Sequence, residues 1–151
     1  MKTSKQSIEQ FLAPKKLAIA GVSHDPKKFG NTVYRELKEK GYEVYPINPN
    51  LDQINGDPCF HSVAALLVDI RHLLVLTPKS QTLQVVKDAV SKGIDHLWIQ
   101  QMSETRETLD YLKDKQINLI HKECIFMWVE PVSSIHKFHR TIRKIFGLLP
   151  R

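Results

Sequence analysis

Short apolar runs alternate with amphipathic segments along this chain. Most of the runs are apolar throughout and are bounded by glycine, proline or charged residues, which is typical of strands buried in a parallel sheet. The pattern predicts five strands, at residues 17–22, 42–47, 70–77, 96–99 and 117–120.

Helical periodicity marks the segments between these runs. In residues 31–40, Val33, Tyr34 and Leu37 recur on one face, and Gly41 follows where a helix typically ends. Similar signals predict helices at residues 8–12, 62–67, 80 or 81 to 92, and 103–112. Proline or glycine ends the first and third of these, and Ser62 is a candidate N-cap for the second.

The repeated order of strand and helix predicts the fold class. Such alternation is typical of a parallel sheet with helices on both faces. At 151 residues the chain has a common size for one domain. We therefore predict a single α/β domain over residues 1–151, a Rossmann-like doubly wound parallel sheet with its core at about residues 15–130.

The C-terminal segment, residues 133–147, carries a separate pattern. Phe138, Ile142, Ile145 and Phe146 recur at helical spacing, and basic residues occupy the other positions. This amphipathic basic helix has three interpretations: packing on its own domain, a homodimer surface, or contact with nucleic acid or anionic lipid. Packing is favoured because so large an apolar stripe has to be buried.

Composition narrows the function classes. With 42% hydrophobic and 25% charged residues, the chain has the composition of an ordinary globular protein. It contains no apolar run long enough for a membrane span or a signal peptide, so we expect a cytoplasmic protein without a membrane partner. The net charge of +6 favours an anionic partner. Nucleic acid is disfavoured because the basic residues are scattered and no aromatic side chains interleave them.

The two cysteines do not indicate a metal site or a disulfide. Cys59 and Cys124 lie far apart in the sequence, so we predict free buried thiols. Cys124 has His121 and Glu130 as sequence neighbours, which raises the alternative of a catalytic nucleophile. The apolar residues 125–129 favour burial instead, so we assign no catalytic residue and no metal ligand.

The loop after the first strand has the chemistry that a pyrophosphate needs. Gly21 permits a tight turn, Ser23 offers a hydroxyl, and the helix from Gly30 or Asn31 directs unpaired N–H groups at an anion. Lys28 adds positive charge. The spacing is not G-x-G-x-x-G, and the alternative is a plain turn with solvated lysines.

The end of the second strand bears on the choice of nucleotide. Asn48-Pro49-Asn50 stands where NAD sites usually place a carboxylate for the ribose hydroxyls. NAD is therefore disfavoured, and the asparagines either form a turn or contact ribose or adenine.

The chain resembles the CoA-binding domain protein family, which is related to the CoA-binding half of the succinyl-CoA synthetase α subunit. The resemblance covers about residues 17–130. The residues that carry it are Gly21-Val22-Ser23, Lys28-Phe29-Gly30-Asn31, Val33-Tyr34, Gly41-Tyr42, Val44-Tyr45-Pro46-Ile47-Asn48-Pro49, Gly56 and Trp98-Ile99-Gln100.

This resemblance implies a Rossmann-type domain that binds coenzyme A or an acyl-CoA across the first strand-helix turn. The implied contacts are Gly21, Val22, Ser23, Lys28, Phe29, Gly30, Asn31, Asn48, Pro49, Thr77, Pro78 and Gln100. Two loops depart from the family, which usually has Pro-Pro at Thr77-Pro78 and Gln-Pro-Gly at residues 100–102.

The resemblance implies binding without acyl-CoA synthesis, since the synthetase takes its phosphorylated histidine from a further domain that this sequence does not show. Whether the chain catalyses any reaction stays open. The alternatives are an oxidoreductase that uses NAD(P) and a small basic nucleic-acid-binding protein. The first predicts a dinucleotide loop that is missing here, and the second predicts a contiguous basic face and steep salt dependence.

Overall fold

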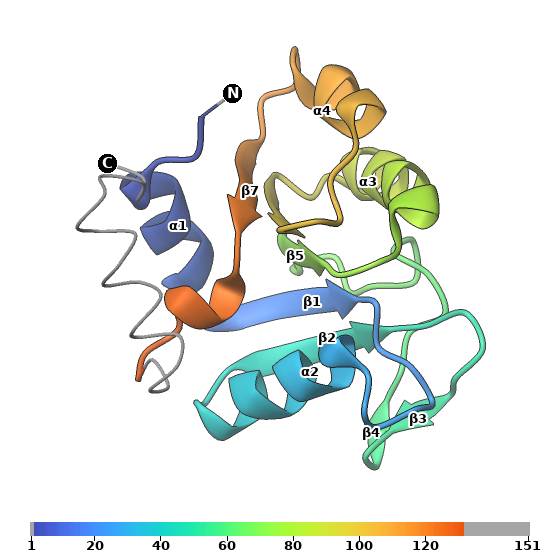
Figure 1. The fold of residues 1–151 in the computed structure, drawn as a ribbon. Helices are drawn as coiled ribbons and strands as arrows, with labels where there is room; N and C mark the ends of the chain where they lie inside the picture. The colour runs from blue at the N-terminus through green and yellow to red at the C-terminus, as the bar shows by residue number, and fades with distance from the viewer. Residues whose placement is uncertain (1, 132–151) are drawn as a thin grey trace.

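A parallel sheet forms the centre of the computed structural model, which describes residues 2–131. Its strands lie in the order β2-β1-β5-β6-β7, and every neighbouring pair is parallel. The strands are β1 (Lys16–Ala20), β2 (Glu43–Ile47), β5 (His72–Val75), β6 (His96–Gln100) and β7 (Asn118–Glu123). The predicted α/β class is thereby confirmed: the described residues form one Rossmann-like domain (Figure 1).

Helices cover both faces of this sheet. They are α1 (Lys5–Leu12), α2 (Phe29–Glu39), α3 (Lys79–Lys92) and α4 (Arg106–Leu112). Leu17 and Ile19 of β1 pack in the same cluster as the apolar residues of α1 and α2. Ala18 and Ala20 point to the opposite face, where α3 and α4 pack. This alternation follows from the period of two in a strand, and it explains why β1 is apolar on both sides.

The strand order changes direction between β1 and β5, because the chain builds outward to β2 first and then to β5, β6 and β7. In doubly wound sheets such a switch point leaves a crevice at the carboxyl ends of the two strands. The helices that follow these strands, α2 and α3, lie on opposite faces. The fold therefore predicts a ligand site at the carboxyl ends of β1 and β5.

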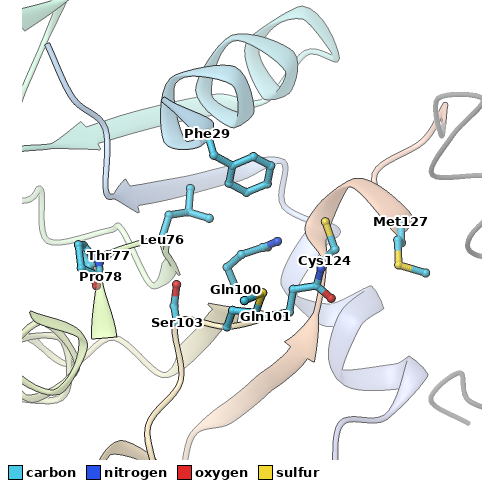
Figure 2. A pocket seen from close by; sticks show the side chains of 10 residues that line it. Phe29, Leu76, Thr77, Pro78, Gln100, Gln101, Ser103, Cys124 and Met127 are labelled. Carbon is cyan, nitrogen blue, oxygen red and sulfur yellow. The ribbon is translucent and has the colours of Figure 1, made fainter. Parts of the chain in front are cut away.

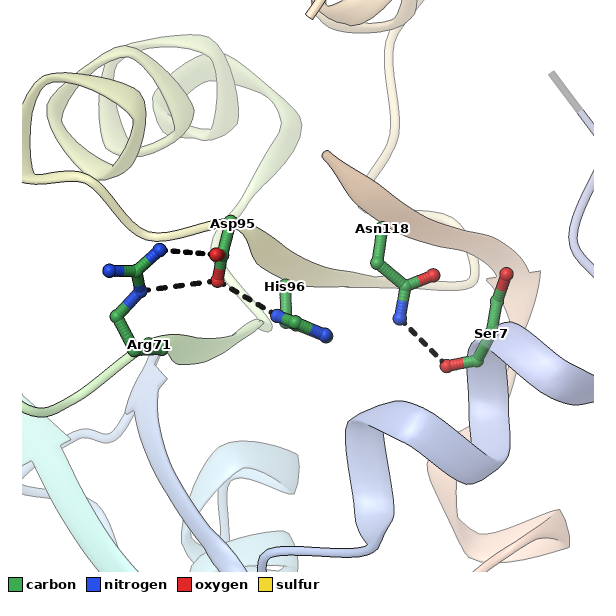
Figure 3. Close-up of polar contacts among 5 residues, drawn as sticks. All are labelled: Ser7, Arg71, Asp95, His96 and Asn118. Atoms are coloured by element: carbon green, nitrogen blue, oxygen red, sulfur yellow. Dashed lines mark hydrogen bonds and ion pairs between the residues drawn. The ribbon is translucent and has the colours of Figure 1, made fainter. Parts of the chain in front are cut away.

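The amino ends of the strands carry a set of paired polar groups (Figure 3). Asp95 accepts hydrogen bonds from the Arg71 guanidinium, and its Oδ1 lies 2.8 Å from His96 Nδ1. The pKa of Asp95 falls to about 2, chiefly because of Arg71. The rings of His72 and His96 stack with centroids 4.2 Å apart.

Helix α1 attaches to the last strand of the sheet. The Thr3 hydroxyl donates to the His121 carbonyl at 3.0 Å and accepts the His121 N–H at 3.1 Å. Asn118 Nδ2 donates to the Ser7 carbonyl at 2.9 Å (Figure 3). The two Thr3 bonds occupy backbone groups of β7, an edge strand whose open side would otherwise pair with other chains.

A two-stranded hairpin lies apart from the main sheet. It consists of β3 (Gln53–Ile54) and β4 (Asp57–Pro58), joined by a turn in which Asn55 and Gly56 both have positive φ. Asp57 accepts hydrogen bonds from Tyr34 and Lys38 of α2, and these partners lower the pKa of its carboxyl group. The sequence interpretation missed this hairpin, although Asn-Gly is the strongest short hairpin signal.

The helix predicted at residues 62–67 is wrong. The segment forms turns, in which the Ser62 hydroxyl accepts the Ala65 N–H at 3.2 Å and the Leu66 N–H bonds to the Val63 carbonyl at 3.1 Å. Only Val63 and Leu66 are buried in this stretch, which is too little apolar surface to hold a helix on the sheet. Elsewhere α2 begins at Phe29 and β7 continues to Glu123. The predicted C-terminal helix at 133–147 lies outside the described residues.

Candidate functional site

Two glycines bring three segments into contact at the switch point. A Cβ on Gly21, which has φ +118°, would lie 2.7 Å from the Leu76 carbonyl carbon. A Cβ on Gly30 would lie 2.1 Å from the Gly21 carbonyl oxygen. Any side chain at either position would separate the backbones. The glycines therefore hold the end of β1 against both the start of α2 and the segment after β5.

The N-terminus of α2 is open. Its N-cap residue, Lys28, makes no side-chain capping bond, and the first turn contains no acidic residue. None of the described residues accepts a hydrogen bond from the backbone N–H of Phe29 or Gly30. An exposed lysine at the positive end of a helix dipole is electrostatically unfavourable unless an anion lies nearby. This end of α2 is therefore suited to bind an anion.

Helix α3 begins in the same way. Pro78 is its N-cap and provides no side-chain bond, Lys79 is its first residue, and no acidic residue follows in the first turn. Within residues 2–131 neither Lys28 nor Lys79 forms an ion pair. The helices on either side of the switch point thus both present uncapped, lysine-flanked ends.

Two asparagines that we expected to contact a ligand instead support the loop after β1. Asn31 Oδ1 accepts the Ser23 N–H at 2.8 Å, and Asn31 Nδ2 donates to the Ser23 carbonyl at 2.7 Å. Asn48 Nδ2 donates to the Val22 carbonyl at 2.7 Å, and its Oδ1 accepts the Asn50 N–H at 2.8 Å. Direct contact of either side chain with a ligand stays a prediction.

A pocket of about 600 Å³ opens beside the start of α2, in the size range of small-molecule sites. It lies over the residues that follow β5, β6 and β7 (Figure 2). Its lining is Phe29, Leu76, Thr77, Pro78, Gln100, Gln101, Met102, Ser103, Cys124 and Met127.

Four of the predicted contacts, Phe29, Thr77, Pro78 and Gln100, line this pocket. Thr77 is buried and shares a hydrogen bond of 3.0 Å with the Thr82 hydroxyl, so it also supports the start of α3. Phe29 is 46% exposed, and its ring makes an edge contact with Phe126 at 5.5 Å between centroids.

The other predicted contacts lie around the α2 end of the site. Gly21 and Gly30 form the close approach, and Val22 is buried. The Ser23 hydroxyl accepts the Asp25 N–H at 3.2 Å, whereas the Lys28 and Pro49 side chains are exposed. The structure thus divides the predicted residues into a loop group around Gly21 and a pocket group around Gln100.

Sequence reasoning assigned no binding role to six residues that line the pocket, Leu76, Gln101, Met102, Ser103, Cys124 and Met127. Their position along the chain could have indicated the pocket, because residues that follow parallel strands meet at one edge of a sheet. Cys124 and Cys59 are free and buried, as predicted. Burial raises the pKa of the Cys59 thiol.

Two negative findings apply to the described part of the chain. Between residues 2 and 131, no three His, Cys, Asp or Glu side chains cluster in a way that would hold a metal ion. In the same range, no helix combines the length and the apolar character needed to cross a bilayer.

The sheet, its switch point and the open helix ends define a Rossmann-like α/β domain with a ligand site at the carboxyl ends of its strands. Residues 15–129 match the family model described as a CoA binding domain. The chain therefore belongs to the CoA-binding domain family.

Relatives differ widely in length. The α subunit of an ADP-forming acetate-CoA ligase II from Pyrococcus furiosus is 31% identical over 88 residues, which is 58% of this chain but only 19% of that subunit. This chain thus spans about a fifth of that ligase relative. The Bacillus subtilis protein YneT is 27% identical over 123 residues, covering 81% of this chain and 91% of YneT.

A solved structure of a conserved hypothetical protein from Pyrococcus furiosus has the same architecture. It superposes with a TM-score of 0.70 at 37% identity, and the match covers 73% of this chain and 95% of that one. Relatives with chains of about this length thus exist beside the long ligases.

Proposed function

We propose that this chain binds coenzyme A, with the CoA diphosphate at the N-terminus of α2. The open helix end carries the proposal: the unpaired N–H groups of Phe29 and Gly30, next to Lys28, match the chemistry of a diphosphate. Family membership and the name of the ligase relative support CoA as the particular nucleotide.

The remaining parts of the site suit the two ends of CoA. The adenosine end would lie toward Asn48 and Pro49, after β2. The pantetheine arm would extend past Phe29 into the pocket after β5 and β6. Bound CoA would supply a thiol for carrying acyl groups, whereas the protein's residues bind and orient the cofactor. We propose a binding role without catalysis of its own.

Calorimetric titration with CoA, NAD, NADP, FAD and ATP tests this assignment. We expect CoA to bind and the dinucleotides not to bind, since asparagine rather than a carboxylate stands directly at the end of β2. Native mass spectrometry of the purified protein provides a second test, because a retained CoA adds its mass. Binding of NAD without binding of CoA would overturn the assignment and leave the fold intact.

A pair of variants tests the location of the diphosphate. Lys28→Ala combined with Lys79→Ala should weaken CoA binding by about tenfold or more, because two charges leave the helix ends. Lys87→Ala is the matched control, since Lys87 is an exposed lysine of α3 outside the pocket lining. Equal affinities in both proteins would place the diphosphate elsewhere.

A further inference from the structure

Gln100 offers an unused hydrogen-bond donor to the pocket. Its side chain is only 4% exposed, and its Oε1 accepts the Ile125 N–H at 3.2 Å. This bond fixes the amide orientation and turns the NH2 group toward the space below Phe29 (Figure 2). No residue in the part of the chain that the structure covers accepts a bond from Gln100 Nε2. The residue is largely buried while its amide nitrogen, which has no protein partner, faces the pocket, so an acceptor on a ligand is well placed to receive this hydrogen bond.

The mouth of the pocket is unusually apolar. Met102 is 79% exposed and Phe29 is 46% exposed, and both line the pocket. Met102 also has φ +72°, a left-handed conformation that favours glycine. A methionine held in that conformation and presented to solvent indicates a function for its side chain at this position.

The pocket is lined by both polar and apolar side chains. Thr77, Gln100 and Ser103 provide polar groups, Phe29, Leu76 and Met127 provide apolar surface, and no charged side chain is present. A ligand that fits carries a carbonyl acceptor beside an uncharged apolar group. A thioester has both features.

We propose that the pocket receives the acylated end of a CoA thioester. In this arrangement Gln100 Nε2 donates to the thioester carbonyl oxygen, and the acyl group packs against Phe29, Met102 and Met127. The inference rests on the proposed CoA site at α2 and extends it, since it makes an acyl-CoA rather than free CoA the preferred ligand. No covalent step is involved.

Calorimetric titration with CoA, acetyl-CoA and butyryl-CoA tests the preference. We expect butyryl-CoA to bind about tenfold more tightly than acetyl-CoA, as two buried methylene groups predict. Met102→Gly should abolish this gain, so that butyryl-CoA and acetyl-CoA bind the variant with affinities within about twofold of each other. Val68→Gly, which removes an exposed apolar side chain outside the pocket lining, should preserve the gain.

Gln100→Glu tests the hydrogen bond. The variant keeps an acceptor for the Ile125 N–H and replaces the donor with a carboxylate oxygen that repels the thioester carbonyl. Affinity for butyryl-CoA should fall by at least about tenfold, and affinity for CoA should fall much less. Circular dichroism and thermal unfolding of each variant show whether its fold is retained.

A ligand without the nucleotide separates this inference from the proposed function. Two of the three methionines, Met102 and Met127, line the pocket, so methyl-labelled methionine reports on it directly by NMR. S-butyryl-pantetheine should shift these two methyl signals even in the Lys28→Ala, Lys79→Ala protein. If CoA fails to bind but these shifts occur, the CoA site is wrong and the acyl pocket stands. If CoA binds without any preference for acyl chains, or if the two methyl signals do not move, the acyl pocket is wrong.

Discussion

The helices of this domain begin in two different ways. At α1 the Ser4 hydroxyl accepts the Ser7 N–H at 3.0 Å, and at α4 Thr105 accepts the Thr108 N–H at 3.1 Å. Helices α2 and α3, which flank the switch point, have Lys28 and Pro78 as N-caps and no capping bond. An N-cap side chain is worth about 1 kcal/mol of stability.

The same backbone groups, the N–H groups of a helix's first turn, can therefore serve either stability or ligand binding. Where no ligand is expected, a side chain satisfies the first N–H groups of the helix. Where the site lies, those groups are left for a ligand, at some cost to the stability of the empty protein.

The largest effect is expected at the contact that holds the open end of α2. Gly30→Ala should lower the free energy of unfolding by about 3 kcal/mol, because the new Cβ would meet the Gly21 carbonyl oxygen. Gly56→Ala is the control: φ is +84° there but nothing lies within 4 Å, so about 1 kcal/mol is expected. Urea denaturation measures both. Equal losses would mean that the backbones at Gly21 and Gly30 can separate easily.

Asn31→Ala should have the next largest effect. It removes two hydrogen bonds to Ser23 and should cost about 2 kcal/mol of stability and weaken CoA binding, because the loop after β1 loses its support. Asn118→Ala removes the single bond to Ser7 at the amino ends of the strands and should cost about 1 kcal/mol with unchanged CoA affinity. Denaturation and calorimetry together separate the two outcomes. A loss of CoA affinity in Asn118→Ala would contradict the division between the two ends of the sheet.

Adding an N-cap side chain to α2 should increase the stability of the free protein and weaken CoA binding. Lys28 has extended backbone angles suited to an N-cap, so Lys28→Asp should stabilise the free protein by about 1 kcal/mol. The same variant should weaken CoA binding by about tenfold or more, because a carboxylate then occupies the anion position. Thr105→Ala, which removes the cap of α4, should destabilise by about 1 kcal/mol and leave CoA binding unchanged. A Lys28→Asp protein that binds CoA normally would show that the helix end is not the site.

The smallest effect is expected from pH. Burial lowers the pKa of His72, and the adjacent His96 lowers it further. Since the unfolded state keeps a pKa of about 6.5, it binds protons more readily than the folded state as the pH falls below about 7. Stability should therefore decline as the pH falls through 6.5, until the folded pKa is passed, with a slope below about 1.4 kcal/mol per pH unit. Denaturation of the wild type and His72→Gln between pH 8 and 5.5 measures this, and an identical slope in both would exclude His72 as the cause.

The fold followed from sequence more completely than the site did. The apolar runs and their glycine or proline boundaries identified all five strands of the main sheet, since burial on both faces leaves a strong local signal. Hydrogen bonds between distant residues left no such signal. Asn31 and Asn48 are polar residues of the kind expected to contact a ligand. Only the structure shows that their side chains hydrogen-bond to the backbone of Ser23 and Val22.

The pocket was the least predictable part. Its residues come from four separate segments. The apolar pattern around Cys124 and Met127 indicated burial and gave no sign of a pocket. Met102 was visible as a departure from the Gln-Pro-Gly of the family, yet its left-handed backbone and its position at the pocket mouth are properties of the folded chain. The small hairpin, by contrast, has a local signal, because Asn55-Gly56 is a dipeptide that predicts a two-residue hairpin turn.

The attachment of Thr3 to His121 has a consequence for biosynthesis. A ribosome makes α1 before β7, so Ile8 and Phe11 cannot be buried completely until almost the whole domain has emerged. Helix α1 is then translated before β7 but becomes fully ordered only together with it. Limited proteolysis of stalled nascent chains would show protection of α1 only after residue 123 has left the exit tunnel, and earlier protection would refute this order of events.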